Sequence, residues 1–291
     1  MTTESEVPDV PEVKRRRGIY LLPNLFTTGC LFAGFYAIVA AMGNRFEPAA
    51  IAIFVAMIMD GLDGRIARLT NTQSDFGAQY DSLADMVAFG LAPALVIYIF
   101  TLSQYGKLGW LAAFIYAACA ALRLARFNTQ VGVADKGFFQ GLASPSAAAV
   151  MAGFVWIGTD YQITGVTLTV LAFIVTFATG LLMVSNIRYR SFKDLDLKGK
   201  VPFVSVIVIM MVFVLITIDP PIILFATFTL YALSGPVTTL IGLRKRRRRH
   251  APENNSTEDA AGSAAKPAAD TPPAAEDELK SSAANDVPPL H

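Results

Sequence analysis

Four aspartates lie within one stretch, DGLDGRIARLTNTQSDFGAQYDSLAD, which runs from residue 60 to 85. Asp60 and Asp63 are three residues apart, and Asp81 and Asp85 are four apart, so each pair shares one face of an expected helix. A short polar loop joins the two helices, which can therefore run antiparallel and bring both acidic faces together. An aspartate at the centre of a bilayer costs about 2.5–3.5 kcal/mol, and four nearby carboxylates repel one another. The cluster therefore predicts bound cations.

Oxygen ligands of this kind suit Mg²⁺, Mn²⁺ or Ca²⁺. Two such ions bridged by carboxylates form a standard device for displacement at phosphorus, because they neutralise phosphate charge and align the reacting oxygens. The glycines Gly61, Gly64 and Gly77 remove side chains where a bulky ligand could approach, and Arg68 could pair with a phosphate. Asp75 lies in the loop without matching spacing and is interpreted as solvent-facing or as a helix cap.

Two plainer explanations compete with a catalytic metal site. Single aspartates near a membrane surface are usually solvated helix ends, but four at helical spacing, interleaved with glycine and arginine, disfavour that explanation. A transporter also uses acids inside a membrane. The cluster lies at one membrane face, however, and neither a second acidic set nor an inverted repeat is evident in the sequence.

The elements that must position these residues belong to a membrane protein. The chain has 291 residues, of which 54% are hydrophobic, and its mean hydropathy is +0.48. This composition and its long apolar runs predict an all-α, polytopic integral membrane helical bundle. At roughly 20 residues per helix, about eight transmembrane helices are expected, at 21–42, 47–68, 80–102, 107–127, 143–159, 166–185, 201–218 and 221–243.

The distribution of basic residues sets the expected orientation. With the N-terminus inside, the inner segments collect the clusters 14–17, 188–200 and 244–249, whereas the outer loops keep only Arg45 and Lys107. By the positive-inside rule this bias predicts an N-in/C-in topology, which requires an even number of spans. The aspartate cluster would then face the cytoplasm, at the inner surface of the cell membrane.

The two ends of the chain differ from the middle. Residues 1–18 form an expected disordered basic arm, residues 19–243 the membrane domain, and residues 244–291 a basic and then disordered cytoplasmic tail, since a composition rich in Ala, Pro and charge buries no core. Cys30 and Cys119 lie in apolar segments and are interpreted as small buried side chains, with neither disulfide nor zinc spacing. No cleavable signal peptide is visible.

The aspartate stretch matches a known signature, D-x2-D-G-x2-A-R-x8-G-x3-D-x3-D, with every fixed position filled. On these residues the chain resembles the CDP-alcohol phosphatidyltransferase family. The resemblance implies an integral membrane enzyme that cleaves the pyrophosphate of a CDP-linked donor, releases CMP and joins the phosphoalcohol to an acceptor hydroxyl. It also implies two divalent cations, Mg²⁺ or Mn²⁺, and a homodimer; no nucleic-acid partner is expected.

The resemblance also implies a role for each signature residue. Asp60, Asp63, Asp81 and Asp85 would hold the metals, and Asp85 would also be the general base. The small residues would admit the cytidine, and the arginine would line the nucleotide pocket. The CDP and pyrophosphate contacts would be Asp63, Gly64, Ala67, Arg68 and Gly77.

Four further stretches resemble one branch of the family, the phosphatidylserine synthases of bacteria and archaea. They are LPNLFTTGCLFAGF (22–35), RLARFN (123–128), FFQGLASPSAAA (138–149) and MVSNIRYRSFK (183–193). The chain departs from that branch near Cys30, where asparagine is usual, and at Ala143, where proline is commoner. The branch implies CDP-diacylglycerol as donor, L-serine as acceptor, and phosphatidylserine and CMP as products.

A serine acceptor carries a carboxylate, which an arginine suits well. The candidates for binding serine or lipid phosphate are Arg123, Arg126, Asn128, Asn186 and Arg188, with Arg188 or Arg126 preferred for the carboxylate. The positive-inside rule alone also places arginines there. Another acceptor (glycerol 3-phosphate, inositol or choline) and a divalent-cation transporter remain the alternatives.

Overall fold

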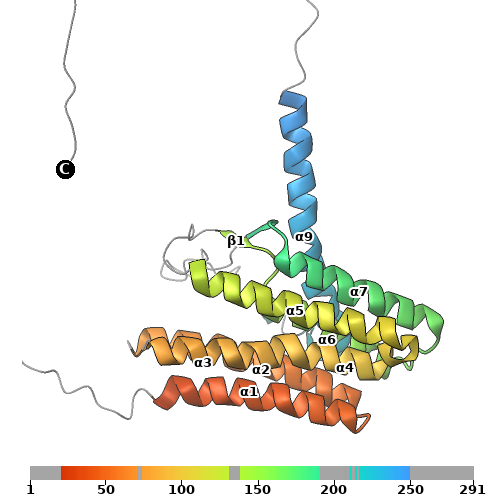
Figure 1. The fold of residues 1–291 in the computed structure, drawn as a ribbon, viewed down its shortest axis with the longest axis horizontal. Helices are drawn as coiled ribbons and strands as arrows, with labels where there is room; N and C mark the ends of the chain where they lie inside the picture. Colours follow the sequence, from red (N-terminus) through yellow and green to blue (C-terminus); the bar gives the residue numbers. More distant parts are fainter. Residues whose placement is uncertain are drawn as a thin grey trace, which may run out of the picture. The chain divides into compact units, whose positions relative to one another are not determined.

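The fold is described from a computed structural model, which covers residues 21–70, 72, 74–130, 138–190, 207, 210, 211, 214 and 216–249. In this part of the chain the architecture is all-helical apart from two strands of three residues each. Figure 1 shows the helices, which are α1 (Leu21–Met42), α2 (Phe46–Leu69), α3 (Asp75–Asp85), α4 (Ala92–Phe100), α5 (Lys107–Gln130), α6 (Ser144–Asp160), α7 (Val166–Val184) and α9 (Pro220–Arg249). This confirms the predicted helical class.

Helices α1 and α2 form an antiparallel hairpin, and α3 also packs on α1. The turn between α1 and α2 is tight because Asn44 adopts a left-handed backbone conformation with φ of 57°, which asparagine tolerates better than most residues. A row of alanines, which includes Ala37, Ala40, Ala49 and Ala56, is fully buried in the core. These small residues let the backbones approach closely, which is how helices associate in an apolar solvent.

The predicted span at 80–102 begins earlier and is interrupted. It starts at Asp75, after Ser74 caps the helix by accepting a hydrogen bond from the main-chain N–H of Gly77 at 3.0 Å. Asp75 is exposed, as predicted, but it is the first helical residue and Ser74 provides the cap. Between α3 and α4 the chain forms a π-helical segment, η2 (Met86–Leu91). A short 3₁₀ turn, η3 (Leu102–Tyr105), then leads to α5.

Helices α5, α6 and α7 complete the bundle, and the loops beside them carry the small antiparallel ribbon of β1 (Phe138–Gln140) and β2 (Arg188–Arg190). Gly141 follows β1 with φ of 79°, and any side chain there would overlap the main-chain oxygen of Met183. The hydroxyl of Tyr189 donates to the carbonyl of Ala232 in α9 at 2.9 Å. Burial raises the pKa of Tyr189 to about 12, so the phenol keeps the proton that it donates.

Five of the described helical stretches are long and apolar enough to cross a membrane: residues 22–42, 75–100, 107–129, 166–184 and 220–241. Helix α2 is not one of these five, and its last ten residues include two aspartates and two arginines. Helix α6 has 17 residues and is therefore roughly 26 Å long, against a hydrocarbon core of about 30 Å. The predicted span at 201–218 lies largely outside the described residues. Eight spans and the N-in/C-in topology stay predictions.

The chain divides into two compact units, Met1–Lys245 and Arg246–His291. The first contains all the packed helices, and in the second the structure describes only the last residues of α9. The predicted disordered arm at 1–18, and the tail beyond residue 249, lie outside the described residues. Within the first unit Cys30 and Cys119 are buried, with 1% and 8% exposure, and both are free thiols, as expected.

Candidate metal and active site

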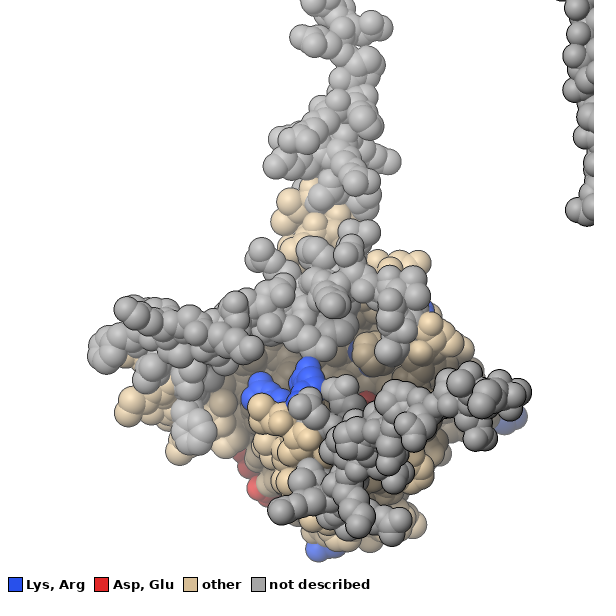
Figure 2. Space-filling view, turned by 90° about the vertical axis from the view of Figure 1, so that its left-hand side faces the viewer, with Lys and Arg blue, Asp and Glu red and all other residues tan. Residues whose placement is uncertain are grey.

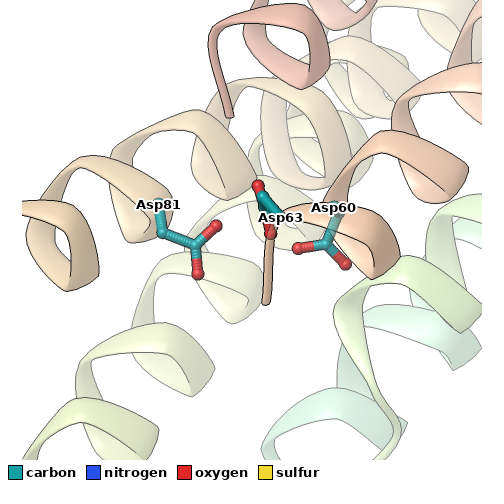
Figure 3. Close-up of side chains that lie close together, drawn as sticks. All are labelled: Asp60, Asp63 and Asp81. Atoms are coloured by element: carbon teal, nitrogen blue, oxygen red, sulfur yellow. The ribbon is translucent and has the colours of Figure 1, made fainter. Parts of the chain in front are cut away.

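Three of the four predicted aspartates converge. Asp60 and Asp63 near the end of α2 and Asp81 on α3 each offer a carboxylate oxygen, and these oxygens all lie within 4.8 Å of one another. Figure 3 shows the three side chains turned toward a common space between the two helices. Asp63 is only 4% exposed, and the other two are half-buried. The helical spacing and the short loop therefore produce the predicted acidic site.

Asp85 lies one turn beyond Asp81, and its carboxyl contacts that of Asp60. Asp85 falls outside the tight group of three, yet its Oδ1 is buried and accepts no hydrogen bond from any described residue. An acceptor atom left unpaired in the interior is costly. A divalent cation would satisfy this oxygen and would offset the repulsion between carboxylates, so the donor set fits a metal that prefers oxygen.

Gly61 and Gly64 leave room beside the carboxylates, whereas a Cβ atom added at Gly77 would lie 3.2 Å from Ser74 Oγ, so less room is left there than predicted. A Cβ atom added at Gly61 or at Gly64 would meet no atom within 4 Å outside its own helix backbone. Arg68 bends back along α2, and its Nε donates to the carbonyl of Gly64 at 2.8 Å. The space over the last turns of α2 is thus open enough for a ligand larger than a metal ion.

An arginine on helix α5 lies near the cluster of aspartates. Arg123 on α5 is close enough to Asp85 and Asp60 to interact with both charges. Its Nη1 donates to the hydroxyl of Ser144 at 2.7 Å, whereas its Nε is buried with no hydrogen-bond partner among the described residues. Ser144 is itself fully buried at the start of α6. A cation with a spare donor therefore borders the carboxylates.

The other residues expected to bind serine or phosphate make different contacts. Arg126 donates from Nη1 to Asn186 Oδ1 at 3.1 Å and from Nη2 to the carbonyl of Gln140 at 2.8 Å, with longer contacts to the main chain at 184 and 185. It therefore ties α5 to β1 and to the end of α7. Asn128 exchanges hydrogen bonds with Ser82 of α3 at 3.0–3.3 Å. Arg188 lies in β2, and its side chain lies outside the part that the structure describes.

Two further residues of this site, Thr27 and Ser144, were not predicted from the sequence. The hydroxyl of Thr27 in α1 is buried and donates to Asp63 Oδ2 at 3.0 Å, which fixes the direction of that carboxylate. Ser144 orients Arg123 in the same way. Thr27 lies in the first of the quoted stretches and Ser144 in the third, but only the fold shows that Thr27 meets Asp63 and that Ser144 meets Arg123.

Basic and acidic side chains occur at the same end of the molecule. Figure 2, which faces the end where α3 begins and α5 finishes, shows blue Lys or Arg atoms in a hollow with red Asp or Glu atoms beside and below them. Such mixed charge suits a ligand that bears phosphates and that is bound together with cations.

Comparisons with known proteins agree with this chemistry. A family model described as CDP-alcohol phosphatidyltransferase matches residues 20–239. The CDP-diacylglycerol–serine O-phosphatidyltransferase of Helicobacter pylori strain J99 is 41% identical over 198 residues, which cover 67% of this chain and 83% of that protein. The enzyme of the same name from Mycobacterium bovis is 38% identical over 187 residues, covering 62% and 64%. That of Methanocaldococcus jannaschii is 39% identical over 142 residues, covering 49% and 63%.

The Thr27 hydrogen bond leads to a prediction about metal affinity. Replacing Thr27→Val removes the donor to Asp63 at nearly constant volume, and losing such an outer-shell partner typically weakens metal binding by 10-fold or more. We expect the dissociation constant for Mn²⁺, measured by calorimetry on the purified protein without substrate, to rise about tenfold. Thr176→Val is the matched control, because this buried threonine bonds only within its own helix, to Ala172. Equal changes in both variants would refute a role for Thr27 in metal binding.

Proposed function

The chain belongs to the CDP-alcohol phosphatidyltransferase family and is an integral membrane protein, and we propose that it transfers the phosphatidyl group of CDP-diacylglycerol to the hydroxyl of L-serine, giving phosphatidylserine and CMP. The observation that carries this proposal is the convergence of Asp60, Asp63 and Asp81 from a signature whose eight fixed positions are all present. The serine acceptor is supported by relatives that bear this activity in their names and are 33–41% identical.

The carboxylates of Asp60, Asp63, Asp81 and Asp85 would hold two divalent cations, Mg²⁺ or Mn²⁺. When bound, these ions would neutralise the pyrophosphate and hold the reacting oxygens in line. The open space above Gly61 and Gly64 would admit the nucleotide and its phosphates. Ala67, Arg68 and Gly77 would border the same ligand.

Asp85 would act as the general base. Its Oδ1 accepts no hydrogen bond from the described residues, so the carboxylate has an oxygen left for a cation or for the proton of the acceptor hydroxyl. It would remove the proton from the serine hydroxyl as that oxygen attacks the phosphorus that bears the diacylglycerol. A bond forms between the serine oxygen and that phosphorus, the bridging bond of the pyrophosphate breaks, and its electron pair leaves with CMP.

Among the described side chains, Arg123 is the cation best placed to bind the serine carboxylate. Arg126, one of the two arginines preferred from the sequence, uses its guanidinium to bind main-chain carbonyls. Arg123 instead keeps an Nε that has no hydrogen-bond partner among the described residues, and its charge is close enough to Asp85 to interact with it. Its bond to Ser144 orients the guanidinium without using that donor. Arg188, Asn128 and Asn186 remain candidates for the edge of the same pocket.

A groove between α1 and α2 would accommodate one acyl chain of the donor. The groove has a volume of about 600 Å³, and its lining is apolar apart from Glu47 and the hydroxyl of Tyr36. It begins at Gly29 and Met59, next to Asp60 in the chain, and follows α2 to Glu47, a distance of about 18 Å. A lipid whose phosphates lie over Asp60 could extend one chain along it toward the far side of the membrane.

Two alternatives make different predictions. A sister enzyme with glycerol 3-phosphate, inositol or choline as acceptor would share the acidic site but would not respond to serine. A divalent-cation transporter would bind metal without releasing CMP. In the described residues one group of at least three acidic side chains has metal-binding geometry, and it lies at one end of the helices.

The proposed reaction is tested by measuring CMP release from CDP-diacylglycerol with purified protein, with and without L-serine, in Mn²⁺ or Mg²⁺. We expect serine-dependent release in the wild type, and a fall of about 10²–10⁴-fold in kcat for Asp85→Asn, because the base is lost while the shape is kept. Release that responds to another alcohol would establish a different acceptor, and metal binding without any CMP would favour the transporter.

The proposed role of Arg123 is tested by the two Michaelis constants. Arg123→Gln should raise the KM for serine by about 10–100-fold, as expected for a charged hydrogen bond worth about 1.5–3 kcal/mol, with little change in the KM for the donor. Arg123→Lys should restore part of the affinity because it keeps the charge. Arg126→Gln is the matched control and should mainly lower the melting temperature. A larger change in the donor KM would place Arg123 on the nucleotide side.

The groove leads to a prediction about chain length. Ile51→Trp would place a large ring about 12 Å along the groove from Met59. We expect the KM for dioleoyl CDP-diacylglycerol to rise about tenfold, or 1.4 kcal/mol, while the dioctanoyl donor is little affected because its chains end before that point. Ile174→Trp on the exposed face of α7 is the control. Equal effects on both donors would exclude the groove as the acyl-chain site.

A further inference from the structure

The helix that carries Asp81 and Asp85 changes its winding directly after Asp85. Residues Met86–Leu91 form the π-helical segment η2, and the main-chain N–H of Ala92 bonds to the carbonyl of Val87, five residues back. A π segment holds one residue more than an α-helix of the same height. Asp85 is thus the last residue before a change in helical register.

The proline at position 93 leaves one carbonyl in this segment without its usual partner. In an α-helix the carbonyl of Phe89 would accept a hydrogen bond from the main-chain N–H of residue 93, but Pro93 has none. Phe89 is fully buried, so water is not at hand to replace that bond. A donor from another part of the protein can take the place of that bond.

Tyr116 of α5 supplies this donor. Its hydroxyl bonds to the carbonyl of Phe89 at 3.1 Å, and the whole tyrosine side chain is buried. Helix α7 packs closely against the backbone of Tyr116, because Gly180 has no side chain at the point of contact. This contact helps to hold the tyrosine in place. The Tyr116 hydroxyl therefore holds the Phe89 carbonyl of η2 against α5.

We propose that Tyr116 is a positioning residue for the transfer reaction: by holding the carbonyl of Phe89 it keeps η2 in the π register that points Asp85 at the metal site. Without the π register, α3 would rotate relative to α4 by about one residue step, roughly 100°. Helix α4 is held by the buried residues Ala92, Val96 and Ile97. It would therefore stay in place, and α3 with its aspartates would rotate. The inference rests on the proposed role of Asp85 in the reaction.

The first test is Tyr116→Phe, which removes the hydroxyl and keeps the ring. We expect kcat to fall by about 10–100-fold, since small misplacements of reacting groups are that costly, and Mn²⁺ affinity to fall, with both KM values within about twofold of the wild type. Tyr98→Phe, at a half-buried tyrosine of α4, is the control and should change none of these. A kcat for Tyr116→Phe within twofold of the wild type would overturn the proposal.

The second test separates positioning from simple satisfaction of a buried carbonyl. Adding Pro93→Ala to Tyr116→Phe restores a main-chain N–H that can bond to Phe89 in an α-helical register. We expect the double variant to regain the wild-type melting temperature while kcat and Mn²⁺ affinity stay low, because Asp85 is now misaligned. Recovery of kcat together with the melting temperature would overturn the proposal.

The double variant still tests the positioning role of Tyr116 if Tyr116→Phe alone does not fold. Its Phe89 carbonyl has a donor, so a folded double variant with low kcat and weak Mn²⁺ binding would support the positioning role. A double variant that fails to fold would overturn it, since the Tyr116 hydroxyl would then hold the bundle together rather than direct Asp85. A wild type that shows no CMP release would instead refute the proposed function, and the Mn²⁺ affinities would still report on the register.

Discussion

The repulsion between carboxylates at the ends of apolar helices is the constraint on which the rest of this structure depends. Asp63 is nearly buried, Asp60 and Asp81 lie within 4.8 Å of it, and Asp85 touches Asp60. Charges so close in a medium of low dielectric are costly unless opposite charge is brought to them. Among the described residues Arg123 offsets part of that charge. Oxygens of Asp60, Asp63 and Asp81 are close enough together to hold a metal ion, which would offset more of it.

The scaffold achieves this with small residues and satisfied main-chain groups. Buried alanines along α1 and α2 let the two helices meet closely, and Thr27 can therefore reach Asp63. Arg126 binds carbonyls where α5, β1 and the end of α7 come together. Each of these contacts is modest in energy, but together they fix the geometry around a group of charges that would otherwise separate.

Much of the site could be predicted from the sequence because its residues are close along the chain. Helical spacing alone places Asp60 beside Asp63, and a short loop brings Asp81 to them. Thr27 and Ser144 could not be identified, because nothing in their local pattern shows which helices will pack together. The hydrogen bonds of Arg126 could not be predicted either. They depend on the ribbon of β1 and β2, whose strands are too short to give a periodic pattern in the sequence.

The fold shows a similar division. Long apolar runs predicted the helices α1 to α7 to within a few residues, apart from the start of α3. The π-helical segment η2 was not predicted, because a hydropathy profile does not detect one inserted residue. Pro93, just after this segment, does signal a break in hydrogen bonding. Helix α2 was predicted as a span on length, and its last ten residues carry four charges, from two aspartates and two arginines.

The chain order of the site has a consequence for its synthesis. The acidic half, with Thr27, is complete once residue 85 has been made, whereas Arg123 follows 38 residues later and Ser144 later still. At about 5–20 residues per second, a growing chain carries the aspartates for roughly two to eight seconds before its own arginine emerges. Metal ions and water at the membrane surface are the partners available in that interval. The nascent chain therefore carries its aspartates without Arg123 until α5 has been made.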